Sequence, residues 1–205
     1  MTDSYLTIEK EAQAEFTEKR SRFIGYVKPV SSEAEALEFV ESIRKKHWDA
    51  KHNVYAFNLK NGVSRFSDDG EPQGTAGMPV LDVLKKQNVV DCVVVVTRYF
   101  GGILLGAGGL VRAYSHAAAL ALDAAKIKEM CPHTLFKTTV DYNLFGKLEN
   151  TILQNGGVVE NTDFAENVIV YFLIPKKCTE KFEKDLSEIS LGSVEAEILE
   201  ENIFR

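Results

Sequence analysis

The 205-residue chain has few cysteines and no pattern that would join them. Cys92, Cys131 and Cys178 are odd in number and widely spaced, and none belongs to a C-x-x-C pair. This argues against a disulfide framework and against a zinc site built on thiolates. A long apolar segment is also missing, because the run VVDCVVVVTRYF is too short and too interrupted to span a bilayer. The acidic N-terminus does not resemble a signal peptide, so we expect a cytoplasmic protein with no membrane partner.

The motifs of three common enzyme classes are missing as well. In the Gly-rich segment the residue five positions after Gly106 is Val111, which breaks the pattern G-x-G-x-x-G. No Lys-Ser/Thr pair follows the glycines, as a P-loop requires, and there is no G-x-S-x-G. These absences argue against a dinucleotide enzyme, a P-loop NTPase and a serine hydrolase, and we expect no cofactor.

The net charge of −6 arises in the second part of the chain. Residues 1–130 hold 17 Lys and Arg against 17 Asp and Glu, whereas residues 131–205 hold 7 against 13. Polyphosphate binding depends mostly on positive charge, so the acidic second part is a poor surface for RNA and is better suited to protein partners. The first part could bind RNA only through a local basic patch, and DNA is not an expected partner.

Hydrophobic periodicity and turn residues predict two sets of strands and helices. In the first part we expect strands within residues 16–30, 52–60, 63–67 and 89–99, and helices within residues 31–48, 75–87 and 110–127. After a linker at Met130-Cys131-Pro132, we expect strands at residues 136–143, 158–165, 168–175 and 195–201, and helices at residues 145–155 and 179–190. The second set has the order βαββαβ, which is that of a ferredoxin-like fold. The prediction is therefore an α+β protein with two domains, residues 1–130 and 131–205.

Two segments of the first part have the composition of a polar site. SDDGEPQGTAGMPV brings Asp68, Asp69 and Glu71 before a helix, and a Gly-rich loop lies between Arg98 and Arg112. Glycines let backbone N–H groups approach a ligand, and arginines can clamp a phosphate or carboxylate. We expect the acidic loop to fold against the turn at residues 98–102, so that carboxylates and arginines meet beside two helix N-termini. The alternative is structural, with tight packing at the glycines and arginines paired to the acids.

The same carboxylates raise the question of a metal, which the sequence leaves undecided. They could hold Mg²⁺ together with substrate phosphates, although an acidic turn whose side chains accept backbone hydrogen bonds is the favoured interpretation. His47, Asp49 and His52 form another possible ligand set, but their spacing is not that of a helical pair. His52 begins a strand, and a hydrogen bond across the fold is its expected role.

Three motifs in one order resemble the IMPACT family, in its bacterial YigZ-like branch. They are AKHNVYAF from Ala50, SDDGEPQGTAGMPVL from Ser67 and VVVVTRYFGGILLGAGGLVRAY from Val93. The resemblance covers residues from about 16 to 126, and residues from about 134 to 203 look like the small domain that follows in the bacterial proteins.

The resemblance implies a first domain with the fold of the second domain of ribosomal protein S5. It implies a second domain similar to the last domain of elongation factor G, in which domains of these two kinds are neighbours. Eukaryotic members of the family regulate translation initiation and carry an additional N-terminal interaction domain. These analogies suggest the ribosome or structured RNA as a partner, although a fold does not determine a function.

The resemblance carries over no catalytic residue, so we do not expect an enzyme. The candidate site for an anion, another ligand or RNA consists of His52, Asn53, Asp68, Asp69, Glu71, Arg98, Gly101, Gly102 and Arg112. The first hypothesis is a translation-associated protein that binds RNA or the ribosome through a groove with Arg98, Arg112 and the lysines near residues 45–51. The second is a metal-dependent hydrolase of small molecules that uses the DDGE loop with His52. The third is a regulatory module that binds proteins through its acidic second domain.

Overall fold

The computed structural model describes residues 4–205 and divides them into two compact units. One unit is Tyr5–Glu129, and the other includes Met130–Arg205. We call them the N-terminal and the C-terminal domain. Both combine an antiparallel sheet with helices, as an α+β fold requires. The expected fold class is confirmed, whereas the likeness of the first domain to ribosomal protein S5 stays a prediction.

The N-terminal domain is built on a five-stranded sheet in the order β2-β3-β6-β4-β5, in which every neighbouring pair is antiparallel. The strands are β2 (Ala12–Glu18), β3 (Ser21–Pro29), β4 (His52–Asn58), β5 (Ser64–Ser67) and β6 (Cys92–Tyr99). β6 is central and buried on both faces, which explains its continuous β-branched sequence CVVVVT.

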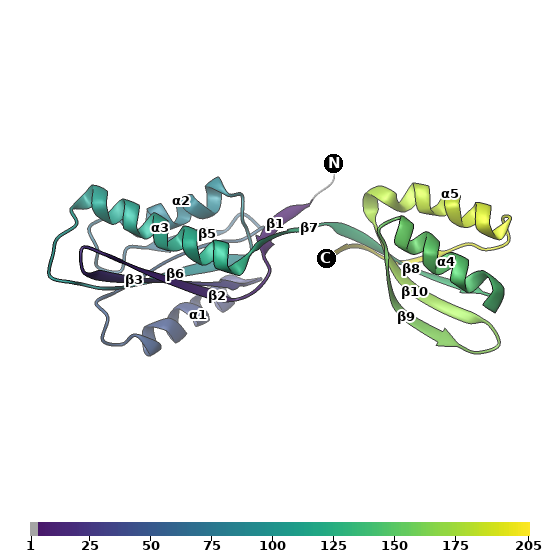
Figure 1. Ribbon diagram of the computed structural model, residues 1–205, viewed down its shortest axis with the longest axis horizontal. Helices are drawn as coiled ribbons and strands as arrows, with labels where there is room; N and C mark the ends of the chain where they lie inside the picture. Colours follow the sequence, from purple (N-terminus) through teal and green to yellow (C-terminus); the bar gives the residue numbers. More distant parts are fainter. Residues whose placement is uncertain (1–3) are drawn as a thin grey trace. The chain divides into compact units, whose positions relative to one another are not determined.

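Helix α1 (Glu33–Lys46) covers one face of this sheet (Figure 1). Its N-cap is Ser32, whose side chain accepts a hydrogen bond from the N–H of Glu35. The Glu35 carboxylate accepts in return from the N–H of Ser31, so the acid holds the start of the helix as in a capping box. The helix buries Ala36, Phe39, Val40 and Ile43 against alternate residues of β3, β4 and β6.

Helices α2 (Gly77–Lys86) and α3 (Ala107–Ala125) cover the opposite face (Figure 1). Most of α3's buried residues are alanines, which lets the helix lie close to β3. At Gly25 of β3 an added Cβ would lie 2.5 Å from the carbonyl oxygen of Ala117, so only glycine permits this approach. β1 (Tyr5–Ile8) pairs with β7 (Ile127–Met130) as a separate two-stranded sheet.

Several connections meet at one end of the five-stranded sheet, which we call the loop end. His52 and Arg22 at this end are paired in the sheet with Arg98 and Tyr99. Figure 1 shows the β2–β3 turn and the Gly-rich connection from β6 to α3 at the end of the domain away from β1 and β7. The loop end comprises residues 19–20, 47–51, 68–76 and 100–106 with the helix turns that adjoin them.

The C-terminal domain has a four-stranded antiparallel sheet in the order β11-β8-β10-β9, with both α-helices on one face (Figure 1). Its elements are β8 (Pro132–Val140), α4 (Tyr142–Gln154), β9 (Val158–Phe164), β10 (Val168–Pro175), a short helix η1 (Lys176–Cys178), α5 (Thr179–Ser190) and β11 (Glu197–Phe204). Phe136, Phe172 and Phe182 are fully buried at its centre. The predicted ferredoxin-like order is confirmed.

The expected linker is not an irregular segment. Met130 ends β7 and Pro132 begins β8, while Cys131 between them exchanges two backbone hydrogen bonds with Arg205. Proline cannot donate a hydrogen bond to a sheet, but the first position of a strand tolerates it. Among the described helices, none is long and apolar enough to cross a membrane.

Candidate functional site

The acidic loop turns its first carboxylate onto the start of helix α2. Asp68 accepts hydrogen bonds from the N–H groups of Gly74, Ala76 and Gly77 at 2.8, 3.1 and 2.8 Å. The first N–H groups of a helix lack acceptors within the helix, and the N-terminal end of its dipole favours a negative charge. Asp68 therefore caps α2 from a position eight or nine residues before the helix. Its carboxylate fills the place at the helix N-terminus where an anionic ligand could have bound.

The second carboxylate joins the loop to strand β4 and helix α1. Asp69 accepts from the N–H of Asn53 at 2.6 Å through one oxygen and from the Arg44 guanidinium at 2.9 Å through the other. The side chain of Asn53 is buried and accepts a hydrogen bond from the Thr97 hydroxyl at 2.8 Å. Asn53 thus holds β4 to β6, and Asp69 holds the loop to β4 and α1.

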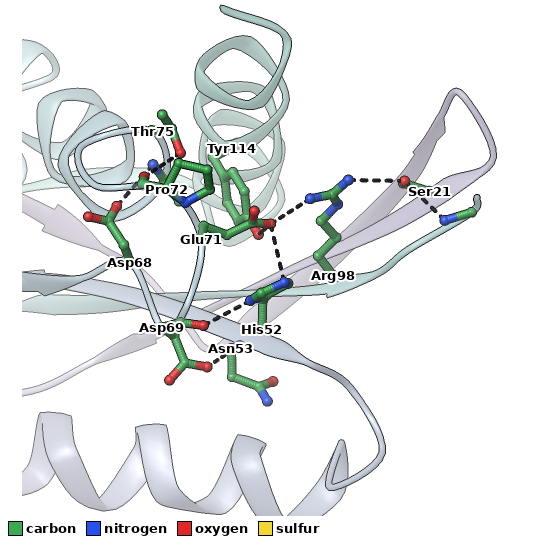
Figure 2. A network of polar contacts seen from close by, with 12 residues as sticks. Ser21, His52, Asn53, Asp68, Asp69, Glu71, Pro72, Thr75, Arg98 and Tyr114 are labelled. Atoms are coloured by element: carbon green, nitrogen blue, oxygen red, sulfur yellow. Dashed lines mark hydrogen bonds and ion pairs between the residues drawn. The ribbon is translucent and has the colours of Figure 1, made fainter. Parts of the chain in front are cut away.

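The third carboxylate lies at the centre of a buried network (Figure 2). One oxygen of Glu71 accepts from the Arg98 guanidinium at 2.6 Å and from the Tyr114 hydroxyl at 2.7 Å. The side chains of Arg98 and Glu71 are only 6% and 4% exposed. Burial, followed by the charge of Glu71, raises the pKa of Tyr114 far above its ordinary value, so the phenol remains a hydrogen-bond donor. This network ties the acidic loop to β6 and α3.

His52 lies between Asp69 and Glu71 in the same network (Figure 2). Its Nδ1 is 2.9 Å from the carbonyl oxygen of Asp69, which can only accept, so Nδ1 carries the proton. Its Nε2 is 4.0 Å from Glu71. The expected hydrogen bond of His52 across the fold is therefore present. Its ring also packs close to Gly70, whose φ of +85° favours glycine.

The start of the Gly-rich loop is fastened to the β2–β3 turn. Ser21 receives hydrogen bonds from the N–H of Gly101 at 3.2 Å and from the second terminal nitrogen of Arg98 at 3.4 Å. A Cβ on Gly101 would collide with the backbone of Arg20. Gly102, by contrast, faces open space with a φ of +84°. Gly101 is thus required for packing, and Gly102 for the direction of the chain.

Arg112 does not join the buried network. It is exposed on the second turn of α3, where it lines a cleft of about 250 Å³ together with Lys19 of the β2–β3 turn. The expectation that Arg98 and Arg112 would together line a basic groove is wrong, because Arg98 is buried in an ion pair with Glu71. Of the two arginines expected to meet the acidic loop, Arg98 alone contacts one of its carboxylates, that of Glu71.

The carboxylates of the DDGE loop do not converge on one point. Each has its own donors: the start of α2 for Asp68, Asn53 and Arg44 for Asp69, and Arg98 and Tyr114 for Glu71. Across residues 4–205 no group of three or more His, Cys, Asp or Glu side chains is arranged to hold a metal ion. The possible ligand set His47, Asp49 and His52 is also divided, because His47 and Asp49 both contact the Tyr99 hydroxyl whereas His52 contacts Asp69.

The surface of the loop end is basic and carries apolar side chains. Six basic residues are exposed there: Lys19, Arg20, Lys45, Lys46, Lys51 and Arg112. Trp48 is 84% exposed, Phe100 50% and Leu104 82%. The three lysines were predicted to belong to this surface, whereas Lys19, Arg20 and Trp48 were not. The dipeptide Lys19-Arg20 between two strands was the signal that could have revealed a basic turn.

Both domains match known sequence families. Residues 19–122 match the Impact N-terminal domain, and residues 138–202 match a domain of unknown function, DUF1949. A solved structure, described as that of a hypothetical protein, superposes with a TM-score of 0.61 at 33% identity and covers 98% of each chain.

Relatives of similar length occur in distant bacteria. IMPACT family member YvyE of Bacillus subtilis is 39% identical over 194 residues, covering 94% of this chain and 89% of its own. IMPACT family member YigZ of Escherichia coli is 35% identical over 187 residues, covering 89% and 92%. A Protein IMPACT homolog of Dictyostelium discoideum is 41% identical over 96 residues, which are 44% of this chain and 27% of its own. The chain therefore belongs to the IMPACT family, with an Impact N-terminal domain followed by a DUF1949 domain.

Proposed function

We propose that this protein binds RNA, in the setting of translation, through the loop end of its N-terminal domain. The observation that carries the proposal is the way this end separates its charges. Asp68, Asp69 and Glu71 are engaged by donors inside the domain, whereas the six basic residues named above are exposed. None of these six forms an ion pair within the part of the chain that the structure describes.

This separation gives the loop end a positive surface although the domain as a whole is balanced. Exposed acids beside the six bases include Glu18, Asp49 and Glu41; Glu41 is paired with Arg44, and Asp49 accepts a hydrogen bond from the Tyr99 hydroxyl. Exposed lysines and arginines bind phosphates and release counterions, which is the main source of affinity for nucleic acids. The buried Arg98 contributes nothing to this affinity, because its charge is already paired with Glu71.

The β2–β3 turn supports the same interpretation through its conformation. Lys19 and Arg20 are the two residues of the turn, and both have positive φ, 44° and 65°. Two-residue turns of this kind favour Asn-Gly, because a side chain in the left-handed region costs about 1–2 kcal/mol per residue. The turn nevertheless has a lysine and an arginine at its tip. Such local strain is typical of functional positions.

Exposed apolar side chains among the bases supply a second kind of contact. Trp48 lies between Lys46 and Lys51 in sequence, and Phe100 and Leu104 belong to the Gly-rich loop. Single-stranded RNA is bound by basic surfaces that carry aromatic rings, on which bases stack. The combination therefore fits RNA with unpaired bases, as in ribosomal RNA, better than a uniform duplex.

The link to translation comes from the family and stays part of the proposal. The eukaryotic members that the first domain resembles regulate translation initiation, and the match to the Dictyostelium relative covers 44% of this chain. The matched Impact N-terminal domain, residues 19–122, contains the whole loop end. A function common to the family would therefore reside in this domain.

The acidic C-terminal domain is the better candidate for a protein partner. Its edge strand β11 exposes Ile198 and Leu199, at 45% and 43%, beside a row of glutamates. An exposed edge strand can pair with an extended peptide, and the acids would favour a basic one. A basic peptide that leaves the amide signals of β11 unchanged would count against this role.

Co-sedimentation with ribosomes and with total RNA tests the main proposal. We expect wild type to pellet at low salt and to be released at moderate salt, and Lys19→Glu/Arg112→Glu to remain largely in the supernatant. The control is Lys85→Glu/Lys86→Glu, which makes the same change of charge at the end of α2, near the opposite end of the sheet. Pelleting of all three proteins to the same extent, or of none at low salt, would contradict the proposal.

A further inference from the structure

A cleft opens at the loop end between strand β2 and helix α3. It has a volume of about 250 Å³ and is lined mainly by Phe16, Glu18, Lys19, Leu105, Arg112 and His116. Neither Phe16 nor His116 takes part in the buried network of Glu71. The cleft is smaller than the range of about 300–1,000 Å³ in which drug-sized ligands bind. Its size therefore suits one small ring with its substituents.

One wall of the cleft is aromatic and held in place. The ring of Phe16 stacks on the buried ring of Phe23, with centroids 5.2 Å apart. The ring of His116 meets Phe16 edge to face at 4.7 Å. His116 is otherwise exposed on α3, so its ring borders both the cleft and solvent. A flat ring entering the cleft would contact Phe16, His116 and Leu105 without rearranging the core.

The polar groups of the cleft favour an anion that also carries hydrogen-bond donors. Lys19 and Arg112 supply positive charge. The Arg112 guanidinium lies close to the first turn of α3, since a Cβ on Gly108 would be 3.6 Å from its terminal nitrogen. That turn starts at Gly106 without a side-chain cap, which adds to the attraction for an anion. Glu18 can accept a hydrogen bond from an amino or hydroxyl group of the ligand.

From this lining we infer that the cleft binds one unpaired nucleotide of the RNA, with its base against Phe16 and His116 and its phosphate between Lys19 and Arg112. A nucleotide combines the three properties that the cleft selects: a flat ring, a phosphate, and donor groups on its sugar or base. The inference rests on the proposed function and names the part of the RNA that this site recognises.

The direct test is a titration of the intact protein with uridine and adenosine monophosphates, followed through the ring signals of His116. The chain has four histidines, and His116→Ala assigns the signal. Ribose 5-phosphate is the matched ligand without a base. We expect both nucleotides to shift His116 and to bind roughly tenfold more tightly than ribose 5-phosphate, as base stacking predicts. Equal binding of ribose 5-phosphate, or an unchanged His116 signal, would overturn the inference.

Two variants separate the base from the phosphate. Arg112→Ala should weaken the binding of nucleotides and of ribose 5-phosphate by a similar factor. His116→Ala should weaken the binding of the nucleotides only. Lys86→Ala, on α2, should change neither. A His116→Ala protein that binds nucleotides as wild type does would contradict the assignment of the base to this wall.

Comparison with RNA binding distinguishes this inference from the function on which it rests. If RNA is retained but mononucleotides leave His116 unchanged, the cleft is not a nucleotide site and the function stands. If mononucleotides bind but the protein retains no RNA, the proposed function fails and the cleft binds a free nucleotide. When both hold, saturating uridine monophosphate should reduce retention of RNA.

Discussion

The two arginines at the borders of the Gly-rich loop lie in opposite surroundings. Arg98 is 5% exposed and pairs with Glu71, which also receives the Tyr114 hydroxyl. Arg112, fourteen positions later, is exposed and lines a cleft with Lys19. In sequence both belong to the same motif, but one stabilises the interior of the loop end and the other belongs to its surface.

The difference shows how a motif can combine structural and functional residues. The carboxylates of the DDGE loop pair with arginines and accept hydrogen bonds from N–H groups at the start of α2. These contacts give the loop end a fixed shape. The charges left for a ligand are those that no carboxylate of the described chain pairs with. Each of the following predictions tests whether these interior and surface roles are separate.

The largest effect is expected from breaking the buried ion pair. Arg98→Ala would leave the Glu71 carboxylate buried without its cation, which costs about 3–5 kcal/mol of the free energy of unfolding. The double variant Arg98→Met/Glu71→Gln should lose less than the two single changes together, because it leaves no unpaired charge. Urea denaturation of Arg98→Ala, of the single variants Arg98→Met and Glu71→Gln, and of the double variant measures this.

Arg44→Ala is the matched control, since this arginine pairs with Asp69 and Glu41 at a half-exposed position. Its loss should cost about 1 kcal/mol or less. If Arg98→Ala proved no more destabilising than Arg44→Ala, the Glu71 network would not have the structural role given to it here.

The two glycines at the start of the loop should differ in their tolerance of a side chain. Gly101→Ala places a Cβ against the backbone of Arg20, and we expect a loss of about 3 kcal/mol. Gly102→Ala meets no atom but keeps a φ of +84°, and we expect about 1 kcal/mol. Thermal unfolding of both variants should rank them in this order, and the reverse order would contradict the packing of Gly101 on the turn.

Removal of the remote cap comes next. Asp68→Ala removes the acceptor of two N–H groups at the start of α2 and of the Gly74 N–H just before it, and we expect a loss of about 2 kcal/mol, at the upper end for helix caps. Asp68→Asn keeps an acceptor and should lose about half as much. Equal losses in urea denaturation would mean that the negative charge, and not hydrogen bonding, determines the effect.

The smallest effect is expected in the dependence of stability on pH, through His47. Burial, followed by the charge of Lys46, lowers the pKa of His47 below its ordinary value of 6.5. As pH falls, the unfolded chain therefore takes up the proton before the folded protein does. The stability that neutral His47 contributes is intact above about pH 6.5 and is lost as pH falls through the lower folded pKa. His47→Gln should make stability less dependent on pH in this window. An unchanged dependence in urea titrations at pH 7.5 and 5.5 would contradict this.

Much of the fold could be predicted from the sequence, because the local signals agree with the packing. Ser32 with Glu35 starts α1, the β-branched run of β6 is buried on both faces, and the second domain follows its strand and helix pattern. Helix α3 was expected from Leu110 but starts at Ala107. Glycines at its first turn concealed that start, since they disfavour a helix unless the surrounding structure fixes it.

The candidate site could be predicted only as a set of residues, and their roles could not. His52, Glu71 and Arg98 do lie together, yet which charges are consumed internally depends on pairing across strands far apart in sequence. Phe16 and His116 are one hundred residues apart and form a wall only because α3 packs on β2. Periodicity within a segment carries no information about such contacts.

The most direct test of the account replaces the strained basic turn by the residues that its conformation favours. Lys19→Asn/Arg20→Gly should raise the free energy of unfolding by about 1 kcal/mol, because positive φ no longer carries a penalty. The same protein should bind ribosomal RNA more weakly, and the slope of log affinity against log salt should fall by about 1–2 as phosphate contacts are lost. A more stable protein with weaker RNA binding would show that the turn is strained in order to present its cations. Unchanged affinity and salt dependence would contradict the assignment of RNA binding to the loop end.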